Sequence, residues 1–125
     1  MSPRLGIFIG GLLGLTGVAA GAFGAHALRG ALDPRSLEIW GTGAAYQQLH
    51  AVLLVAVAIW ARAEATALRR AAMVLLAVGV VVFSGALYTV ALGGPRILGA
   101  VAPVGGLCLM AGWAVIAIEG LRRAR

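Results

Sequence analysis

The residues of this sequence that could do chemistry are a few polar side chains, one helical turn apart, inside long apolar stretches. Tyr46 and His50 are four residues apart, as are Ser84 and Tyr88, and Gln47 adjoins the first pair. Residues four apart share one face of a helix, so each pair presents its polar groups together. These side chains can bind a small ligand, or they can hydrogen-bond one another and fix how the helices pack.

The depth of these side chains predicts that they meet. Counted at about 1.5 Å per residue from the ends of their apolar stretches, His50, Ser84 and Tyr88 lie roughly 7 to 13 Å inside a membrane. An unpaired polar group at that depth costs several kcal/mol, so we expect His50 to face Ser84 or Tyr88, with Tyr46 one turn away.

Two more residues extend this candidate site. Pro103 has no amide hydrogen to donate to the carbonyl of Gly99, so Gly99 is expected to present a free acceptor. His26 lies nearer the surface, at the end of the first apolar stretch. The candidate ligand-binding residues are His50, Tyr46, Gln47, Ser84, Tyr88, Gly99 and His26.

These residues do not predict an enzyme. A metal or haem site would need His26 and His50 to converge. No acidic or thiol side chain lies at their depth to complete such a site. A serine hydrolase could use Ser84 and His50, but no carboxylate is placed to orient the imidazole. Proton-coupled export needs a carboxylate inside the membrane, and all four acidic residues lie outside the uncharged stretches. We expect no catalytic residues, no metal and no other cofactor.

The elements that position these side chains are predicted to be membrane helices. Of the 125 residues, 62% are hydrophobic and 11% are charged, which is too few charges to cover a soluble fold of this size. The net charge of +6 lies at the edges of uncharged runs, which indicates membrane flanks and no binding of nucleic acid. The runs have 22 to 25 residues, and about 20 helical residues cross a membrane. They cover residues 5–28, 39–61, 71–95 and 97–118.

The predicted fold is a single all-α membrane domain over residues 1–125. Short connections make sequential helices antiparallel neighbours, which gives an up-down-up-down four-helix bundle. Asp33 and Pro34 form a cap and a first turn, so the second helix is expected to begin at Pro34. The helices are expected at about residues 4–28, 34–62, 69–93 and 96–121.

The arginines predict the orientation of this bundle. Seven of the ten lie on the side that both termini share with the middle connection. The positive-inside rule therefore places both termini in the cytoplasm. Among these charges, Glu119 is expected to form an exposed ion pair with Arg122 or Arg123, which contributes little to stability.

The first apolar stretch carries glycines every three or four residues, which line one face of a helix. Another helix can approach such a face closely, and in a membrane this fit drives association. The partner is either another helix of the same chain or a second protein. The helix-packing glycines are Gly6, Gly10, Gly14, Gly17, Gly21 and Gly24.

Four segments resemble the signatures of a known family. They are GAFGAH at 21–26, YQQLHA at 46–51, FSGALY at 83–88 and LGAVAPVGG at 98–106. In this order they are similar to the YgdD and YwdK family of small bacterial inner-membrane proteins, the domain-of-unknown-function family four-two-three. The resemblance covers nearly the whole chain. It implies a multi-pass four-helix protein of the bacterial inner membrane, with no assigned reaction and no catalytic residues.

Three functions are open at this point. The polar cluster either only fixes the packing or binds a small ligand or lipid that enters from the outer leaflet. Alternatively, the chain is an accessory or stabilising subunit of a larger membrane complex and docks through the glycine face. The expected partners are the lipid bilayer and either a second copy of the chain or a larger membrane complex.

Overall fold

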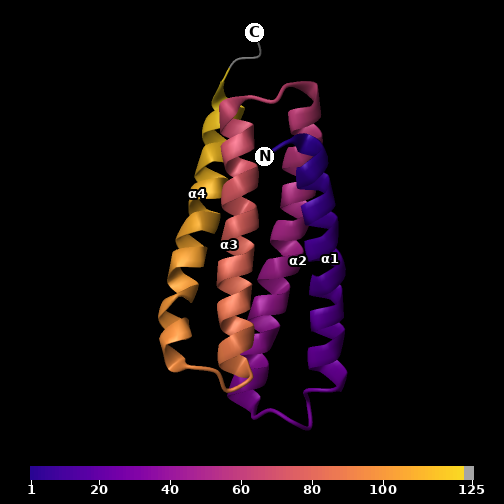
Figure 1. Ribbon diagram of the computed structural model, residues 1–125, viewed down its shortest axis with the longest axis vertical. Coiled ribbons are helices and arrows are strands. Elements are labelled where there is room, and N and C mark those ends of the chain that lie inside the picture. The colour runs from indigo at the N-terminus through magenta and orange to yellow at the C-terminus, as the bar shows by residue number, and fades with distance from the viewer. Residues whose placement is uncertain (123–125) are drawn as a thin grey trace.

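The computed structural model describes residues 1–122 and contains four long helices joined by short connections (Figure 1). With the short η1 counted together with α4, all four are long and apolar enough to cross a membrane. The described chain is therefore all-helical, as predicted. The elements are α1 (Pro3–His26), α2 (Pro34–Ala63), α3 (Ala67–Ala91), the 3-10 helix η1 (Arg96–Ala100) and α4 (Ala102–Leu121).

Polar side chains fix where the second helix begins. The carboxylate of Asp33 accepts hydrogen bonds from the backbone amides of Arg35 and Ser36, and Pro34 occupies the first turn, where its missing amide hydrogen costs nothing. The Ser36 hydroxyl donates to Asp33 at 2.6 Å, and this bond, with the amide bonds, holds the pKa of Asp33 below its ordinary value. Ser2 caps α1 and Thr66 caps α3 in the same way.

The fourth helix differs from the prediction at its start. Residues 96–100 form η1, and α4 begins only at Ala102. Pro103 therefore lies in the first turn of α4, where backbone amides have no partner within the helix. The prediction that Pro103 lies within the fourth helix, one turn after Gly99, is therefore wrong, because Gly99 belongs to η1.

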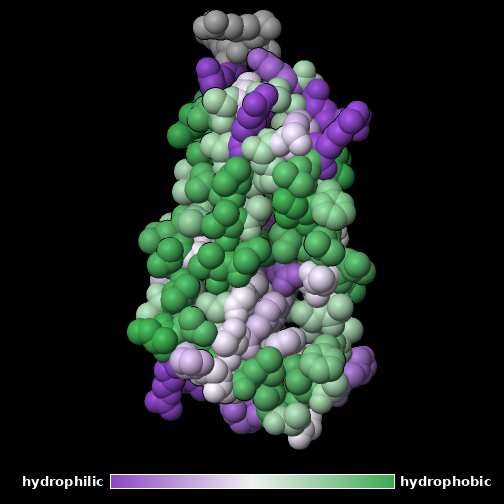
Figure 2. Space-filling view, viewed as in Figure 1, coloured by the Kyte–Doolittle hydropathy of each residue, from purple (hydrophilic) through white to green (hydrophobic). Residues whose placement is uncertain are grey.

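The helices form a row in chain order (Figure 1). α1 packs on α2, α2 on α3, and α3 on α4; α1 makes a few contacts with α3, and within residues 1–122 it does not reach α4. This differs from a closed bundle, in which every helix has two full neighbours. On the surface of the row, Figure 2 shows a band of hydrophobic side chains between hydrophilic ends. α2 and α3 are flanked on both sides, so they supply most of the buried side chains.

Two apolar clusters lie at different heights along the helix axes. The larger joins the second half of α2 to the first half of α3, where Leu54, Met73 and Leu76 are completely buried. The smaller is formed by Leu28, Trp40, Ala91 and their neighbours at the end with the α1–α2 connection. Along α2, the candidate residues Tyr46, Gln47 and His50 lie between Trp40 of the smaller cluster and Leu54 of the larger one.

The glycine face of α1 packs against α2 of the same chain. A Cβ atom added at Gly10 would lie 2.6 Å from Cγ2 of Val55 and 3.2 Å from the carbonyl oxygen of Ala51, so only glycine fits at this distance. Gly14 is packed more loosely, because its nearest neighbour, Cβ of Ala51, would be 3.9 Å away. The other members of the face in close contact are Gly6, Gly17, Gly21 and Gly24.

Candidate functional site

His50 lies in a pocket formed by α2, α3 and α4 and is only 3% exposed. Its Nδ1 is 2.8 Å from the backbone carbonyl of Tyr46, and its Nε2 accepts a hydrogen bond of 3.3 Å from the indole N–H of Trp113. A carbonyl can only accept and an indole N–H can only donate. These two partners therefore specify the neutral tautomer of His50 with its hydrogen on Nδ1.

The His50 pocket has a volume of about 370 Å³ and a mostly apolar lining. Tyr46 lies at its rim, 43% exposed, with its ring 5.7 Å from that of His50 and 4.7 Å from that of Phe83. The hydroxyl of Tyr46 forms no hydrogen bond within residues 1–122. On α4, Gly106 and Met110 complete the wall. The pocket is thus lined by a tyrosine whose hydroxyl has no partner in the described chain, by a buried imidazole and by an apolar surface.

Ser84 and Tyr88 do not reach His50. Ser84 donates a hydrogen bond of 2.8 Å to the carbonyl of Gly43, and the Tyr88 hydroxyl donates one of 2.7 Å to Oε1 of Gln47. The predicted contact of His50 with Ser84 or Tyr88 is therefore wrong. The reason is the register of α2 against α3, which sets Ser84 beside Gly43, seven residues or about two helical turns from His50.

Gln47 is instead the centre of a second polar network, which joins three helices. Its amide nitrogen donates to the carbonyl of Leu13 at 2.9 Å and to the hydroxyl of Thr16 at 2.8 Å, both on α1. Its oxygen accepts from Tyr88 on α3. A groove of about 620 Å³ between α1 and α3 leads to this network. The network uses both amide hydrogens of Gln47 and the hydrogen of Tyr88, so its role is to hold the helices together.

The glycine face also makes backbone acceptors on α1 accessible. Gln48 donates to the carbonyl of Gly17 at 2.9 Å, and the indole of Trp40 donates to the carbonyl of Ala20 at 2.8 Å. Each accepting carbonyl lies four residues before a glycine, because Gly17 precedes Gly21 and Ala20 precedes Gly24. A helical carbonyl points along the axis toward residue i+4, where glycine has no side chain to cover it. The same relation holds for Leu13 and Gly17.

The structure therefore divides the seven predicted site residues into three groups. Tyr46 and His50 lie in the His50 pocket, whereas Gln47, Ser84 and Tyr88 bind neighbouring helices. His26 is exposed at the end of α1, and Gly99 is exposed on η1, so neither belongs to the pocket or to the network.

Trp113 is the functional candidate that the sequence analysis missed. It supplies the hydrogen-bond donor to His50, and its ring meets the imidazole edge-on at 6.4 Å. A tryptophan inside an apolar run was a usable signal, because a buried indole N–H usually has an acceptor.

Glu119 is buried at the end of the helices opposite the α1–α2 connection, although an exposed ion pair was expected there. Only 5% of the residue is exposed. Its carboxylate accepts a hydrogen bond of 2.7 Å from Thr66 and lies 3.0 Å from Nε of Arg69 and 3.4 Å from Arg122. Arg123, the other expected partner, lies outside the described residues. This cluster joins the end of α4 to the start of α3. The predicted pairing of Glu119 with Arg122 is confirmed, whereas the prediction that Glu119 is exposed is wrong.

Comparisons with known proteins identify relatives along the whole chain. A family model described as "Protein of unknown function (DUF423)" matches residues 20–106. The UPF0382 membrane protein SH2409 of Staphylococcus haemolyticus is 39% identical over 93% of this chain and 94% of its own length. The UPF0382 membrane protein YwdK of Bacillus subtilis is 35% identical over 93% and 95%, and the UPF0382 inner membrane protein YgdD of Escherichia coli K12 is 34% identical over 100% and 95%. No solved structure matches.

Proposed function

Because the chain belongs to the DUF423 family of membrane proteins, which has no assigned activity, we propose from the site itself that it binds a small amphiphilic molecule of the membrane in the His50 pocket. The chain is a multi-pass protein of the bacterial inner membrane, in agreement with its four apolar helices and the names of its relatives. A molecule dissolved in the bilayer can therefore reach a pocket that α2, α3 and α4 form.

The free hydroxyl of Tyr46 carries this proposal. The ring nitrogens of His50 already bind the backbone carbonyl of Tyr46 and the indole N–H of Trp113. The side-chain hydroxyl of Tyr46 is therefore the polar group that is left for a ligand. A hydroxyl in the apolar part of a membrane gains strongly from an acceptor. We infer a ligand with an apolar body against Phe83 and Met110 and a carbonyl or ester oxygen at Tyr46.

We expect binding without catalysis. His50 has no carboxylate partner in its hydrogen bonds, and its lone pair on Nε2 is engaged by Trp113. Among residues 1–122, no group of three or more histidine, cysteine or acidic side chains could hold a metal ion.

The pocket can be tested by filling it. Protein purified in mild detergent is expected to carry a small molecule that mass spectrometry detects after organic extraction. Met110→Trp should abolish this retention, because the larger side chain occupies the pocket, and Tyr46→Phe should weaken it about tenfold by removing one hydrogen bond. Leu107→Trp is the matched control, since Leu107 is exposed on the same helix and does not line the pocket. Equal retention by the two tryptophan variants would overturn the proposal.

We further propose that the chain crosses the membrane up-down-up-down with both termini in the cytoplasm. The packing of Gly6 near the end of α2 and of Gly24 near its start supports opposite directions for these two helices. The majority of the arginines on the side of the termini supports the orientation.

Single cysteines test this orientation. With Cys108 replaced by serine, a cysteine at Ser2 should be protected from a membrane-impermeant thiol reagent in intact cells. A cysteine at Gly30, which is exposed with open space around it, should react. After the cells are broken, both should react. Labelling at Ser2 in intact cells would contradict the orientation.

The accessory-subunit hypothesis loses the surface assigned to it, because α2 covers the glycine face of α1. Association with a second copy or a larger complex stays a prediction, and it would have to use another face of the row.

A further inference from the structure

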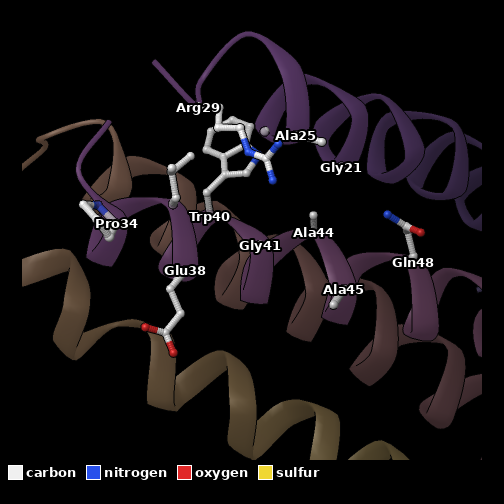
Figure 3. Close-up of a pocket in the computed structure, with 12 residues that line it drawn as sticks. Gly21, Ala25, Arg29, Pro34, Glu38, Trp40, Gly41, Ala44, Ala45 and Gln48 are labelled. Atoms are coloured by element: carbon white, nitrogen blue, oxygen red, sulfur yellow. The ribbon is translucent and has the colours of Figure 1, made fainter. Parts of the chain in front are cut away.

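We propose that a second site, a groove between α1 and α2, holds one membrane phospholipid with its phosphate on Arg29 and one acyl chain along the groove. The groove has a volume of about 610 Å³ and lies at the end of the helices where α1 connects to α2 (Figure 3). It shares no lining residue with the His50 pocket. The proposal is therefore independent of the ligand proposed for that pocket.

Small residues on both helices form the walls of this groove. Gly21 and Ala25 contribute from α1, and Gly41 and Ala45 contribute from α2, each pair four residues apart on one helix face. A Cβ atom added at Gly41 would meet nothing within 4 Å, so the groove is open at this position. An acyl chain fits a smooth channel of this kind, because in a membrane van der Waals contact, not burial from water, decides what packs there.

Arg29 supplies a positive charge at the mouth of the groove. In Figure 3 its side chain extends over the groove, with the guanidinium between α1 and α2. Arg29 forms no ion pair within the described chain. Glu38 also lines the groove, but its carboxylate points to the far side of α2 in Figure 3 and leaves the guanidinium uncompensated. A phosphate matches this guanidinium, because its oxygens can accept two parallel hydrogen bonds from one arginine.

The length of the groove favours a phospholipid over a free phosphate. From Glu38 at the mouth to Gln48 at the inner end is ten residues of α2, or about 15 Å. This equals about half of a hydrocarbon core of roughly 30 Å, the depth that one acyl chain occupies in its leaflet. A charge at the membrane surface above a chain-length groove whose walls are mainly small side chains corresponds to the two parts of a lipid.

The proposal can be tested by native mass spectrometry of the detergent-solubilised protein titrated with four probes. Dioleoyl phosphatidylglycerol and dioleoyl phosphatidylethanolamine should bind with similar affinity, since both present a phosphate. Dioleoylglycerol, which lacks the phosphate, should bind about tenfold more weakly, and inorganic phosphate should not bind measurably. Equal affinity for dioleoylglycerol and the two phospholipids would overturn the role of the phosphate.

Two pairs of variants assign the binding to the groove. Arg29→Gln should reduce phospholipid affinity about tenfold, whereas Arg35→Gln, an exposed arginine of the same region that does not line the groove, should leave it unchanged. Gly41→Leu should block the acyl chain, and Gly85→Leu, at an open glycine on α3, is its control. No difference within either pair would overturn the proposal. If Gly41→Leu instead split a dimer and left lipid binding intact, the groove would be the contact with a second copy, which also refutes the lipid site.

Discussion

Replacing Gly105 by alanine is expected to destabilise the protein by about 1 to 3 kcal/mol, because the added methyl group would overlap the backbone of α3. Its Cβ would lie 2.8 Å from Cα of Phe83 and even closer to the amide nitrogen of Phe83. A side chain can rotate out of the way, whereas backbone can move only with its helix. The change therefore has to separate α3 from α4.

Gly106→Ala is the matched control for this change. A Cβ at Gly106 would be 3.8 Å from its nearest neighbour, an ordinary contact with the ring of Phe83. The free energy of unfolding of both variants can be measured by denaturation in mixed micelles. A Gly105 variant as stable as the Gly106 variant would show that α3 and α4 are not as close as the structure places them.

Replacing Gln47 by leucine is expected to cost about 2 kcal/mol, because it removes three hydrogen bonds between helices at about 0.6 kcal/mol each. The change also leaves the Tyr88 hydroxyl without its acceptor. Gln48→Leu should cost about a third as much, since Gln48 donates only to the carbonyl of Gly17. Unfolding in mixed micelles measures both variants.

A double-mutant cycle separates the Gln47–Tyr88 hydrogen bond from the rest of the network. Tyr88→Phe alone should lower the free energy of unfolding by about 0.6 kcal/mol, but in the Gln47→Leu background it should lower it little, because its partner is already gone. Purely additive effects would mean that the two side chains do not interact.

The apolar helices could be predicted from the sequence because bilayer thickness alone sets their length. The uncharged runs located all four, and Asp33 with Pro34 located the start of α2. The start of α4 could not be predicted in this way, because residues 97–100 belong to the same uncharged run as α4 but are part of η1. Composition measures hydrophobicity and not the backbone hydrogen bonds that separate a 3-10 turn from an α-helix.

The side-chain partners in the site could be predicted only in part. The polar residues were recognised by type, and the spacing of the glycines showed that a helix lies close to α1. The partners depend on the register between helices, which a single sequence does not contain. In the observed register Ser84 lies beside Gly43, about two turns from the expected position beside His50. Trp113 of α4 lies beside the imidazole instead.

α3 and α4 were predicted from the sequence as neighbours, but the glycines that bring them close together were not identified. Gly79, Gly105 and Gly112 lie at this interface, but they are spread over two helices and form no repeated spacing within one. Glu119 was expected to be exposed because it adjoins the arginines near the C-terminus, whereas Thr66 and Arg69 of a distant segment cover it.

The arrangement of the helices as a row has a consequence for biosynthesis. Each helix packs on the one made just before it, and α1 needs no contact with α4. Nearly all contacts between helices can therefore form while the ribosome is still adding the next segment, without waiting for the last helix to close a ring. A chain whose contacts are between sequential segments folds faster than one that must join its two ends. The row therefore allows the helices to assemble in the order in which they are synthesised.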